Sequence, residues 1–290
     1  MIIVNLKGGL GNQMFQYALG RRLALVEKQE VKFDTTGYNQ NHYRSYGLGI
    51  FKVKENFATA TEIANLKYPW GLISKIWRLF KAKILRQNYI GWVPSVFRAI
   101  SSKNYYLDGY WQSYKYFEKI RETLLEEFSL KTELGQTHPE LLAKISEVNS
   151  VSLSVRRTDY LWPVNLKSIG VCSVNYYKKA IELIESKVAD PVFFVFGDDL
   201  DWAKANILTK HQVFYISELN TNNPTKDYQE LVLVSHCKHN IIANSSFSWW
   251  PAWLNQNPDK IVIAPDTWLS DGSIKINDIV PSSWIKLPRN

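Results

Sequence analysis

Cysteine is scarce in this sequence, and long apolar runs are missing. The only two cysteines, Cys172 and Cys237, are too few for a disulfide framework and lack the spacing of a metal site. This usage indicates a reducing compartment. No stretch approaches the apolar length that spans a bilayer. Only a short apolar run precedes Lys7, so we expect no signal peptide and a cytoplasmic protein.

Complete nucleotide-binding fingerprints are missing as well. A glycine-rich turn at 7–12 follows an expected strand at 2–6 and precedes an expected helix at 13–27. The dinucleotide fingerprint fails at its third glycine, where Met14 stands, and no Lys-Ser/Thr pair completes a P-loop. This argues against a nicotinamide-dependent oxidoreductase. The glycines either make only a sharp turn or, with the free N–H groups of the helix start, bind an anion or a hydroxyl.

What is present is a large, basic, globular chain. It has 290 residues, of which 46% are hydrophobic and 21% are charged, enough for two domains of about 150 residues or one large domain. The formal net charge of +8 favours anionic partners. A nucleotide phosphate, an anionic membrane surface and nucleic acid would all satisfy it, so charge alone does not choose among them.

The second half of the chain alternates strands with helices, as parallel βαβ units do. Strands are expected at 151–155, 192–196, 240–243 and 261–264. The best linker lies at 131–139, and we expect two domains, 1–148 and 149–290. The fold class that this pattern predicts is α/β, with doubly wound sheets.

Two arginines stand directly after the first of these strands, in VSLSVRRTDY. In an open α/β sheet, ligands bind at the carboxyl ends of the strands. Adjacent side chains diverge, so only one of Arg156 and Arg157 can point at a given ligand. A guanidinium suits phosphate because its planar fork donates two hydrogen bonds and stays charged. The alternative is a surface ion pair between Arg157 and Asp159.

Two other strand ends carry polar motifs, GDD at 197–199 and NSS at 244–246. Both sit where a helix begins, and the second offers hydroxyls and free N–H groups that suit a phosphate. Helix capping explains each motif taken alone, and Asp198 and Asp199 are interpreted first as caps. If the three strands are neighbours, RRTD, GDD and NSS converge on one crevice.

Residues 73–86, ISKIWRLFKAKILR, have apolar residues at helical spacing and a strongly basic opposite face. One hypothesis is that this helix touches an anionic membrane, with the protein peripheral on the inner face of the plasma membrane. The alternative is a helix docked on the core with a solvated basic face.

Four segments resemble a known family: GGLGNQMFQYALGRRLA, SVRRTDY, FGDDLDWAK and CKHNIIANSSFSWWPAWLN. They are similar to the bacterial α-1,2-fucosyltransferases of glycosyltransferase family 11, nearly from end to end. The resemblance implies a GT-B glycosyltransferase, with two Rossmann-like domains facing each other across a cleft. The N-terminal domain would take the acceptor side and the C-terminal domain the GDP-sugar.

The resemblance also implies roles for individual residues. The donor-binding set is Ser154, Arg156, Arg157, Glu230, Asn244, Ser245, Ser246 and Phe247. The acceptor or sugar side is Gly11, Asn12 and Gln13. The catalytic set is Arg156, Asn12 and Asp159. Arg156 matches the family's ligand of the donor β-phosphate, and Asp159 orients the arginines.

The activity implied is transfer of L-fucose, with inversion and without a metal or other cofactor, from GDP-fucose to the 2-OH of a galactose-terminated glycan, free or lipid-linked. It belongs to surface polysaccharide (O-antigen) synthesis, with no nucleic acid as partner. The family pattern is HxRRxD, usually with glycine before the aspartate, but Ser154 replaces the histidine and Thr158 the glycine. The donor therefore stays open between GDP-fucose and GDP-colitose. The alternative from another class is a non-catalytic carbohydrate- or nucleotide-binding protein.

Overall fold

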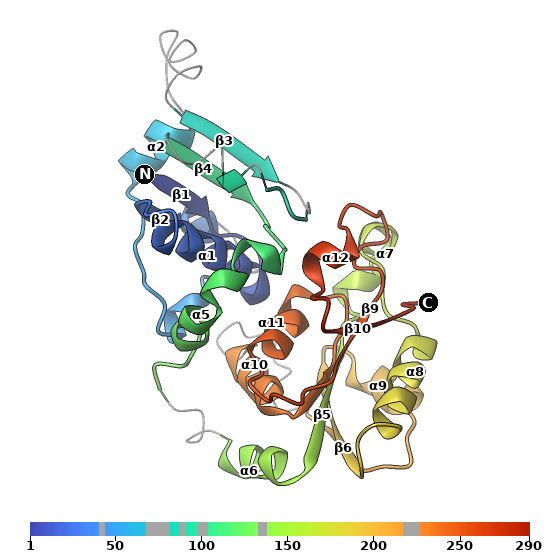
Figure 1. The fold of residues 1–290 in the computed structure, drawn as a ribbon. Helices are drawn as coiled ribbons and strands as arrows, with labels where there is room; N and C mark the ends of the chain where they lie inside the picture. Colours follow the sequence, from blue (N-terminus) through green and yellow to red (C-terminus); the bar gives the residue numbers. More distant parts are fainter. Residues whose placement is uncertain are drawn as a thin grey trace. The chain divides into compact units, whose positions relative to one another are not determined.

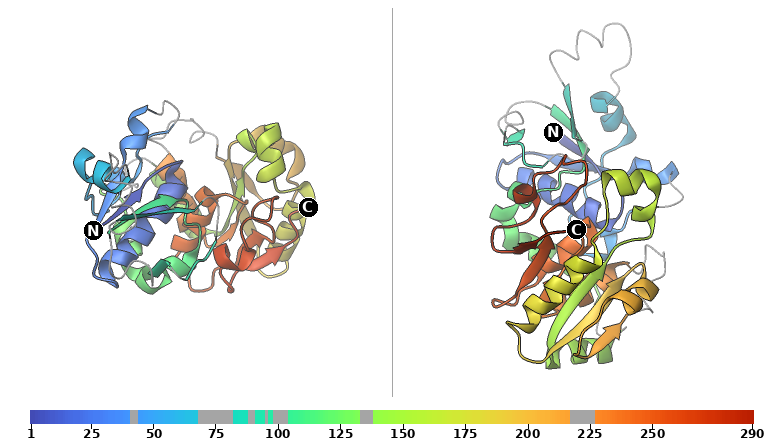
Figure 2. Two further views of the ribbon diagram at one scale, coloured as in Figure 1. Left: turned by 90° about the horizontal axis from the view of Figure 1, so that it is seen from above. Right: turned by 90° about the vertical axis from the view of Figure 1, so that its right-hand side faces the viewer.

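Two parallel β-sheets organise the chain, one in each of two compact units, Met1–Lys131 and Thr132–Asn290 (Figures 1 and 2). The computed structural model describes residues 1–40, 44–67, 82–87, 91–94, 96–97, 104–132, 138–216 and 227–290. The division falls earlier than the boundary we expected at 148. Helix α6 (Pro139–Glu147) belongs to the second unit because it packs on β5 and α10. The functions assigned to the two domains stay predictions.

The first unit contains a four-stranded sheet in the order β2-β1-β4-β3, with every pairing parallel. Its strands are β2 (Val31–Asp34), β1 (Ile2–Asn5), β4 (Asn104–Gly109) and β3 (Ala82–Gln87). Its α-helices are α1 (Leu10–Leu25), α2 (Ala60–Lys67) and α5 (Arg121–Glu127). The apolar side chains of β1 are fully buried, as expected for a parallel strand covered on both faces.

Helix α1 begins earlier than the sequence suggested. We expected a turn through Asn12, but the helix starts at Leu10, so Gly11 and Asn12 lie in its first turn. Farther along, Arg21 donates two-pronged hydrogen bonds to the carboxylate of Glu127, and the Tyr17 hydroxyl donates to the same carboxylate at 2.7 Å. Because these partners are buried, they fix α5 firmly against α1.

The basic helix expected at 73–86 is wrong over its last five residues. Residues 82–86 belong to strand β3, which pairs in register with β4 from Ala82↔Asn104 to Gln87↔Gly109. Hydrogen bonding to a strand distant in sequence overrides the local helical pattern here. Residues 73–81 lie outside the described part of the chain.

The second unit contains a six-stranded sheet in the order β10-β9-β8-β5-β6-β7, again with every pairing parallel. Its strands are β5 (Asn149–Val155), β6 (Pro191–Gly197), β7 (Val213–Tyr215), β8 (His239–Ile241), β9 (Val262–Pro265) and β10 (Ile285–Leu287). The three-residue strands β7 and β10 were not expected from the sequence. Counted from β5, the order is 3-2-1-4-5-6, the Rossmann order, with its switch point between β5 and β8.

Helices cover both faces of this sheet (Figure 1). On one face lie α8 (Val174–Glu185) and α9 (Leu200–Asn206), and on the other α10 (Asp227–His236) and α11 (Ser246–Leu254). The short helices α7 (Pro163–Ser168) and α12 (Ile276–Ile279) lie on the connections. Trp249 and Trp250 of α11 are fully buried, which makes them core residues. Within the described residues, no helix is both long and apolar enough to cross a membrane.

Candidate functional site

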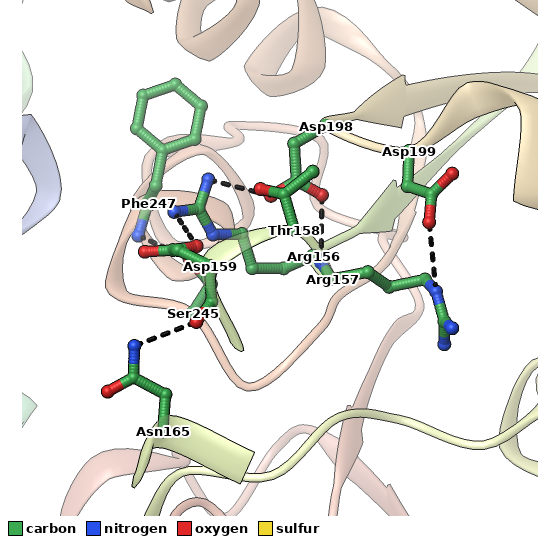
Figure 3. Close-up of polar contacts among 9 residues, drawn as sticks. All are labelled: Arg156, Arg157, Thr158, Asp159, Asn165, Asp198, Asp199, Ser245 and Phe247. Atoms are coloured by element: carbon green, nitrogen blue, oxygen red, sulfur yellow. Dashed lines mark hydrogen bonds and ion pairs between the residues drawn. The ribbon is translucent and has the colours of Figure 1, made fainter. Parts of the chain in front are cut away.

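The carboxyl edge of the second sheet brings the three polar motifs together. Strand β5 lies between β6 and β8, and Val155 pairs with Gly197 at the last register position. The loops that carry RRTD, GDD and NSS therefore leave three adjacent strands at one edge, beside the switch point. The condition for their convergence is met, and Figure 3 shows the side chains gathered there.

Arg156 is held by two carboxylates and still reaches solvent. One terminal nitrogen donates to Asp159, and the other lies 3.0 Å from Asp198 Oδ2. The guanidinium also stacks over the ring of Tyr160, with its central carbon 5.2 Å from the ring centroid. The side chain is 29% exposed. Since a guanidinium has five N–H donors, these contacts leave donors for an anionic ligand.

The electrostatics keep Arg156 charged. Burial disfavours the charged guanidinium, but the fields of nearby acidic groups, that of Asp198 above all, outweigh it and raise the pKa of Arg156. Glu230 on α10 adds to the same effect. Glu230 was placed in the donor-binding set from the resemblance, and the structure brings its charge within reach of this arginine.

Arg157 points the other way (Figure 3). Its Nε donates to Asp199 Oδ2 at 3.2 Å, and its guanidinium lies over the indole of Trp202, with the central carbon 4.0 Å from the ring centroid. Both partners belong to the start of α9, so this side chain anchors the arginine loop to the next loop of the sheet. Adjacent residues diverge here as expected, with Arg156 as the one that is more open to ligand.

Asp198 is the residue whose importance the sequence analysis missed. It was interpreted as a helix cap, yet only Asp199 caps α9, by accepting from the backbone N–H of Trp202 at 3.1 Å. Asp198 instead accepts from the backbone N–H of Arg157 at 2.8 Å and from the Thr158 hydroxyl at 2.7 Å. Together with its ion pair to Arg156, these bonds shape the arginine loop. The sequence hint to this role was that RRTD and GDD both follow expected strands, whose ends meet when the strands are neighbours.

Around α11, the polar residues divide into inner and outer positions. The Asn244 side chain is buried and donates to the carbonyls of Ile169, Gly170 and Trp268, so it supports the loops rather than offering its amide to a ligand. Ser245 caps the helix by accepting from the Phe247 N–H at 3.3 Å. Ser246 begins the helix and is partly exposed, as is Phe247.

Tyr160 connects the arginine to the helix start. Its phenol lies under Arg156 and interacts with the Ser245 side chain. Burial raises the pKa of the Tyr160 phenol, although the nearby arginine acts in the opposite sense, so the phenol stays protonated at neutral pH. Ser154, two residues before Arg156, is buried in β5, and its carbonyl accepts from the Tyr177 hydroxyl at 3.1 Å.

The expected acceptor-side residues lie in the first unit, at the start of α1. Gly11 and Gln13 are buried, and the Gln13 carboxamide is fully used: it donates to the carbonyls of Gly8 and Ser45 and accepts from the N–H of Gly47. Gln13 thus fixes the glycine turn to a neighbouring loop. Asn12 is partly exposed and accepts from Gln112 at 2.7 Å. Of the three residues, Asn12 is the one with a side chain placed to meet a ligand.

In chemical terms, the second unit offers a partly exposed cation beside a helix N-terminus, and the first offers a neutral carboxamide. The cation beside the helix N-terminus suits phosphate. No three metal-ligating side chains gather among the residues the structure describes. The roles assigned to single residues from the sequence stay predictions.

Comparison with known proteins identifies the family. The model of "Glycosyl transferase family 11" matches residues 1–288. An Escherichia coli "Alpha-1,2-colitosyltransferase" is 30% identical, with 100% of this chain and 99% of that protein covered. The Escherichia coli "O-antigen biosynthesis glycosyltransferase WbnK" is 31% identical, with 97% of this chain and 99% of the relative covered.

Among solved structures, a mutant of Arabidopsis thaliana FUT1 in complex with GDP shares the fold with a TM-score of 0.54. Its sequence identity is 10%, and the match covers 91% of this chain and 70% of that one. The expected GT-B fold class is confirmed. With a family model that spans nearly every residue and full-length relatives at 30% identity or more, the chain is a glycosyltransferase and belongs to glycosyltransferase family 11.

Proposed function

We propose that this enzyme transfers L-fucose or colitose from its GDP-sugar to the 2-OH of a galactoside, forming an α-1,2 linkage in surface polysaccharide (O-antigen) synthesis. The observation that carries the proposal is Arg156, a charged and partly exposed guanidinium beside the N-terminus of α11. The names of the two Escherichia coli relatives support colitose and O-antigen synthesis. The donor is assigned to the second unit and the acceptor side to the first.

The proposed reaction is a single displacement. The acceptor oxygen attacks C1 of the sugar on the face opposite the nucleotide, and the C1–O bond breaks with its electron pair passing to the β-phosphate. Arg156 and the N–H groups at the start of α11 stabilise that growing negative charge. The proton of the acceptor hydroxyl ends on the released phosphate. Asp159 and Asp198 keep the arginine charged and oriented.

Because the guanidinium supplies the positive charge, the proposed reaction uses no metal or other cofactor. Turnover in excess EDTA tests this point: we expect the rate to equal that in the presence of Mg²⁺. A rate that disappears with EDTA and returns with one divalent cation would contradict it.

The central experiment is to incubate the purified protein with GDP-fucose and GDP-colitose against a panel of β-galactosides, and to determine the product linkage by NMR. We expect an α-1,2 product with at least one donor. Thermal stabilisation by GDP without any product would favour the alternative, a nucleotide-binding protein without catalytic activity. Stabilisation by the glycan alone would favour a carbohydrate-binding protein.

We also propose that the protein contacts an anionic membrane from the cytoplasmic side. An apolar patch on the segment after Asp159 supports this: Leu161, Trp162, Val164 and Leu166 are 40%, 66%, 80% and 44% exposed. No carboxylate occurs between Asp159 and Glu182, whereas three lysines do. Exposed aromatic and aliphatic side chains with basic neighbours suit the headgroup region of an anionic bilayer.

Vesicles of phosphatidylcholine with and without phosphatidylglycerol test the contact. The double change Trp162→Ser and Val164→Ser should weaken co-sedimentation with the anionic vesicles by at least about tenfold, since each such side chain is worth about 1.5–3 kcal/mol when buried. The matched control is Leu208→Ser, because Leu208 is 78% exposed in the same unit but lies outside the patch. Equal binding by the wild type and the double variant would reject the patch.

A further inference from the structure

At the carboxyl edge of the first sheet, two glutamines with no role expected from the sequence, Gln16 and Gln112, hold the loops around Asn12. Strands β1 and β4 are parallel neighbours, so the loops that follow them lie side by side. Gln16 ties these loops together: it accepts from the Lys7 N–H at 2.9 Å and donates to the carbonyls of Lys7 and Gly109. The loop after β4 is thereby held against the first turn of α1.

Asn12 is oriented by a residue from that loop. The Nε2 of Gln112 donates to Asn12 Oδ1 at 2.7 Å. This bond occupies the oxygen of the Asn12 carboxamide, while its Nδ2 has no hydrogen-bond partner within the described ranges. Gly8 makes room for the nitrogen, because a Cβ at that position would lie 2.7 Å from Asn12 Nδ2.

Gln112 is placed by an unusual backbone. Trp111, the residue before it, has a φ of +54°, a left-handed conformation that costs a residue other than glycine about 1–2 kcal/mol. The Trp111 side chain is buried, and its indole N–H has no partner among the described residues. Strain of this kind persists where the surrounding structure requires it, often at functional sites. Here it turns the chain so that the buried Gln112 meets α1.

We propose that Gln112 is a positioning residue that fixes the Asn12 carboxamide so that its NH₂ group, and not its oxygen, faces the substrate. The inference rests on the proposed function, in which Asn12 contacts the acceptor or the sugar. An NH₂ group donates to a hydroxyl or ring oxygen of a sugar, whereas a flipped carboxamide would present only an acceptor. Without Gln112, both orientations of the carboxamide would be populated.

The variant Gln112→Glu tests this directly, because a carboxylate accepts hydrogen bonds but donates none. It should turn the Asn12 NH₂ toward the introduced carboxylate and away from the substrate. We expect kcat/KM for the acceptor to fall about tenfold, equivalent to about 1.4 kcal/mol, while the Kd for GDP is unchanged. The matched control is Gln29→Glu, the same chemical change between α1 and β2, which should leave both constants unchanged.

A double-mutant cycle separates positioning from a general structural effect. If Gln112 acts only through Asn12, then Gln112→Glu should cause no further loss in an Asn12→Ala background. Additive losses would overturn the inference, and so would a wild-type kcat/KM for Gln112→Glu. A wild-type kcat/KM for Asn12→Ala alone would overturn it as well, because there would then be no role for Gln112 to support.

An NMR measurement tests the hydrogen bond without any turnover, so its failure is distinct from a failure of the proposed function. With asparagine labelled in the side-chain amide, Gln112→Glu should move the Asn12 NH₂ proton signals downfield as they become hydrogen-bonded to the carboxylate. The Gln29→Glu control should not move them. An unchanged Asn12 signal in Gln112→Glu would overturn the positioning role even if the enzyme is active.

Discussion

The two sheets end in edges of the same geometry but opposite chemistry. At the carboxyl edge of the first sheet, which we call the neutral edge, the loops are joined mainly by hydrogen bonds of carboxamides, those of Asn12, Gln13, Gln16 and Gln112. At the carboxyl edge of the second sheet, which we call the ionic edge, the loops are joined by ion pairs among Arg156, Arg157, Asp159, Asp198 and Asp199. Both edges follow parallel strands and precede helix N-termini.

The difference indicates which ligand each edge fits. Carboxamides donate and accept without net charge, which matches the hydroxyls of a sugar. A guanidinium matches phosphate, and the surrounding carboxylates keep that of Arg156 charged and in place before a ligand arrives. One architectural rule, ligand binding at the carboxyl ends of parallel strands, thus supports two kinds of recognition in one chain.

The two edges should differ in how they tolerate a methyl group at a glycine. A Cβ at Gly197, where φ is +144°, would lie 2.1 Å from the backbone oxygen of Val155, so Gly197→Ala must push β5 and β6 apart. We expect a loss of about 4 kcal/mol or more in the free energy of unfolding. Gly8→Ala meets only the movable Asn12 side chain and should lose about 1–2 kcal/mol. Urea unfolding of both variants measures the contrast, and equal losses would contradict it.

At the ionic edge, we expect Arg156 to matter for catalysis and Arg157 for stability. Arg156→Ala should lower kcat about 10²–10³-fold, as removal of a donor to developing charge does elsewhere. Arg157→Ala should lower kcat much less and lower the thermal midpoint of unfolding instead, because this side chain anchors loops through Asp199 and Trp202. Initial rates at saturating donor, together with thermal unfolding curves, test both. An Arg156→Ala enzyme with near-wild-type kcat would remove the basis of the proposed mechanism.

The smallest effect concerns an ion pair at the carboxyl edge of the first sheet, Lys7 with Asp108. Burial opposes ionisation of Asp108, but hydrogen bonds from Lys7 and Asn5 outweigh it and lower the pKa of Asp108 below its ordinary 3.8. A carboxyl with a lowered pKa in the folded state stabilises the protein above its unfolded pKa, and that stability is lost as pH falls through the folded value.

We therefore expect the free energy of unfolding to fall below about pH 4, by about 1 kcal/mol or less from this partly exposed pair. Asp108→Asn should flatten this part of the curve measured by urea unfolding at several pH values. A curve that keeps its full slope in Asp108→Asn would assign the loss to other carboxylates.

Much of the fold was predictable because its signals are local. The strands expected at 2–6, 151–155 and 192–196 agree with β1, β5 and β6 to within a few residues. Apolar runs between turn residues mark buried parallel strands wherever they occur. The strands that the sequence did not predict depend on partners distant in the chain. Strand β3 forms by pairing with β4, and β7 and β10 are short edge strands with little hydrophobic pattern of their own.

In the candidate site, too, local features were predictable and contacts between distant residues were not. The residue types and their positions at strand ends were readable, as was the divergence of adjacent arginines. The partners were not: Asp198 was interpreted as a cap but binds the arginine loop, and the NH₂ group of Asn244 donates to three backbone carbonyls. A side chain's partner depends on which loops the sheet order places together, and that order is a property of the whole unit.

By itself, the sequence determined the class of fold, the motifs at the strand ends and the family, because periodicity and residue chemistry are written along the chain. Only the tertiary structure decided that β5 lies between β6 and β8, that Arg156 rather than Arg157 stays open, and that Gln112 reaches Asn12. The physical reason is that hydrogen bonds and ion pairs act over a few ångströms in space, whereas Gln112 and Asn12, for example, are 100 positions apart in the sequence.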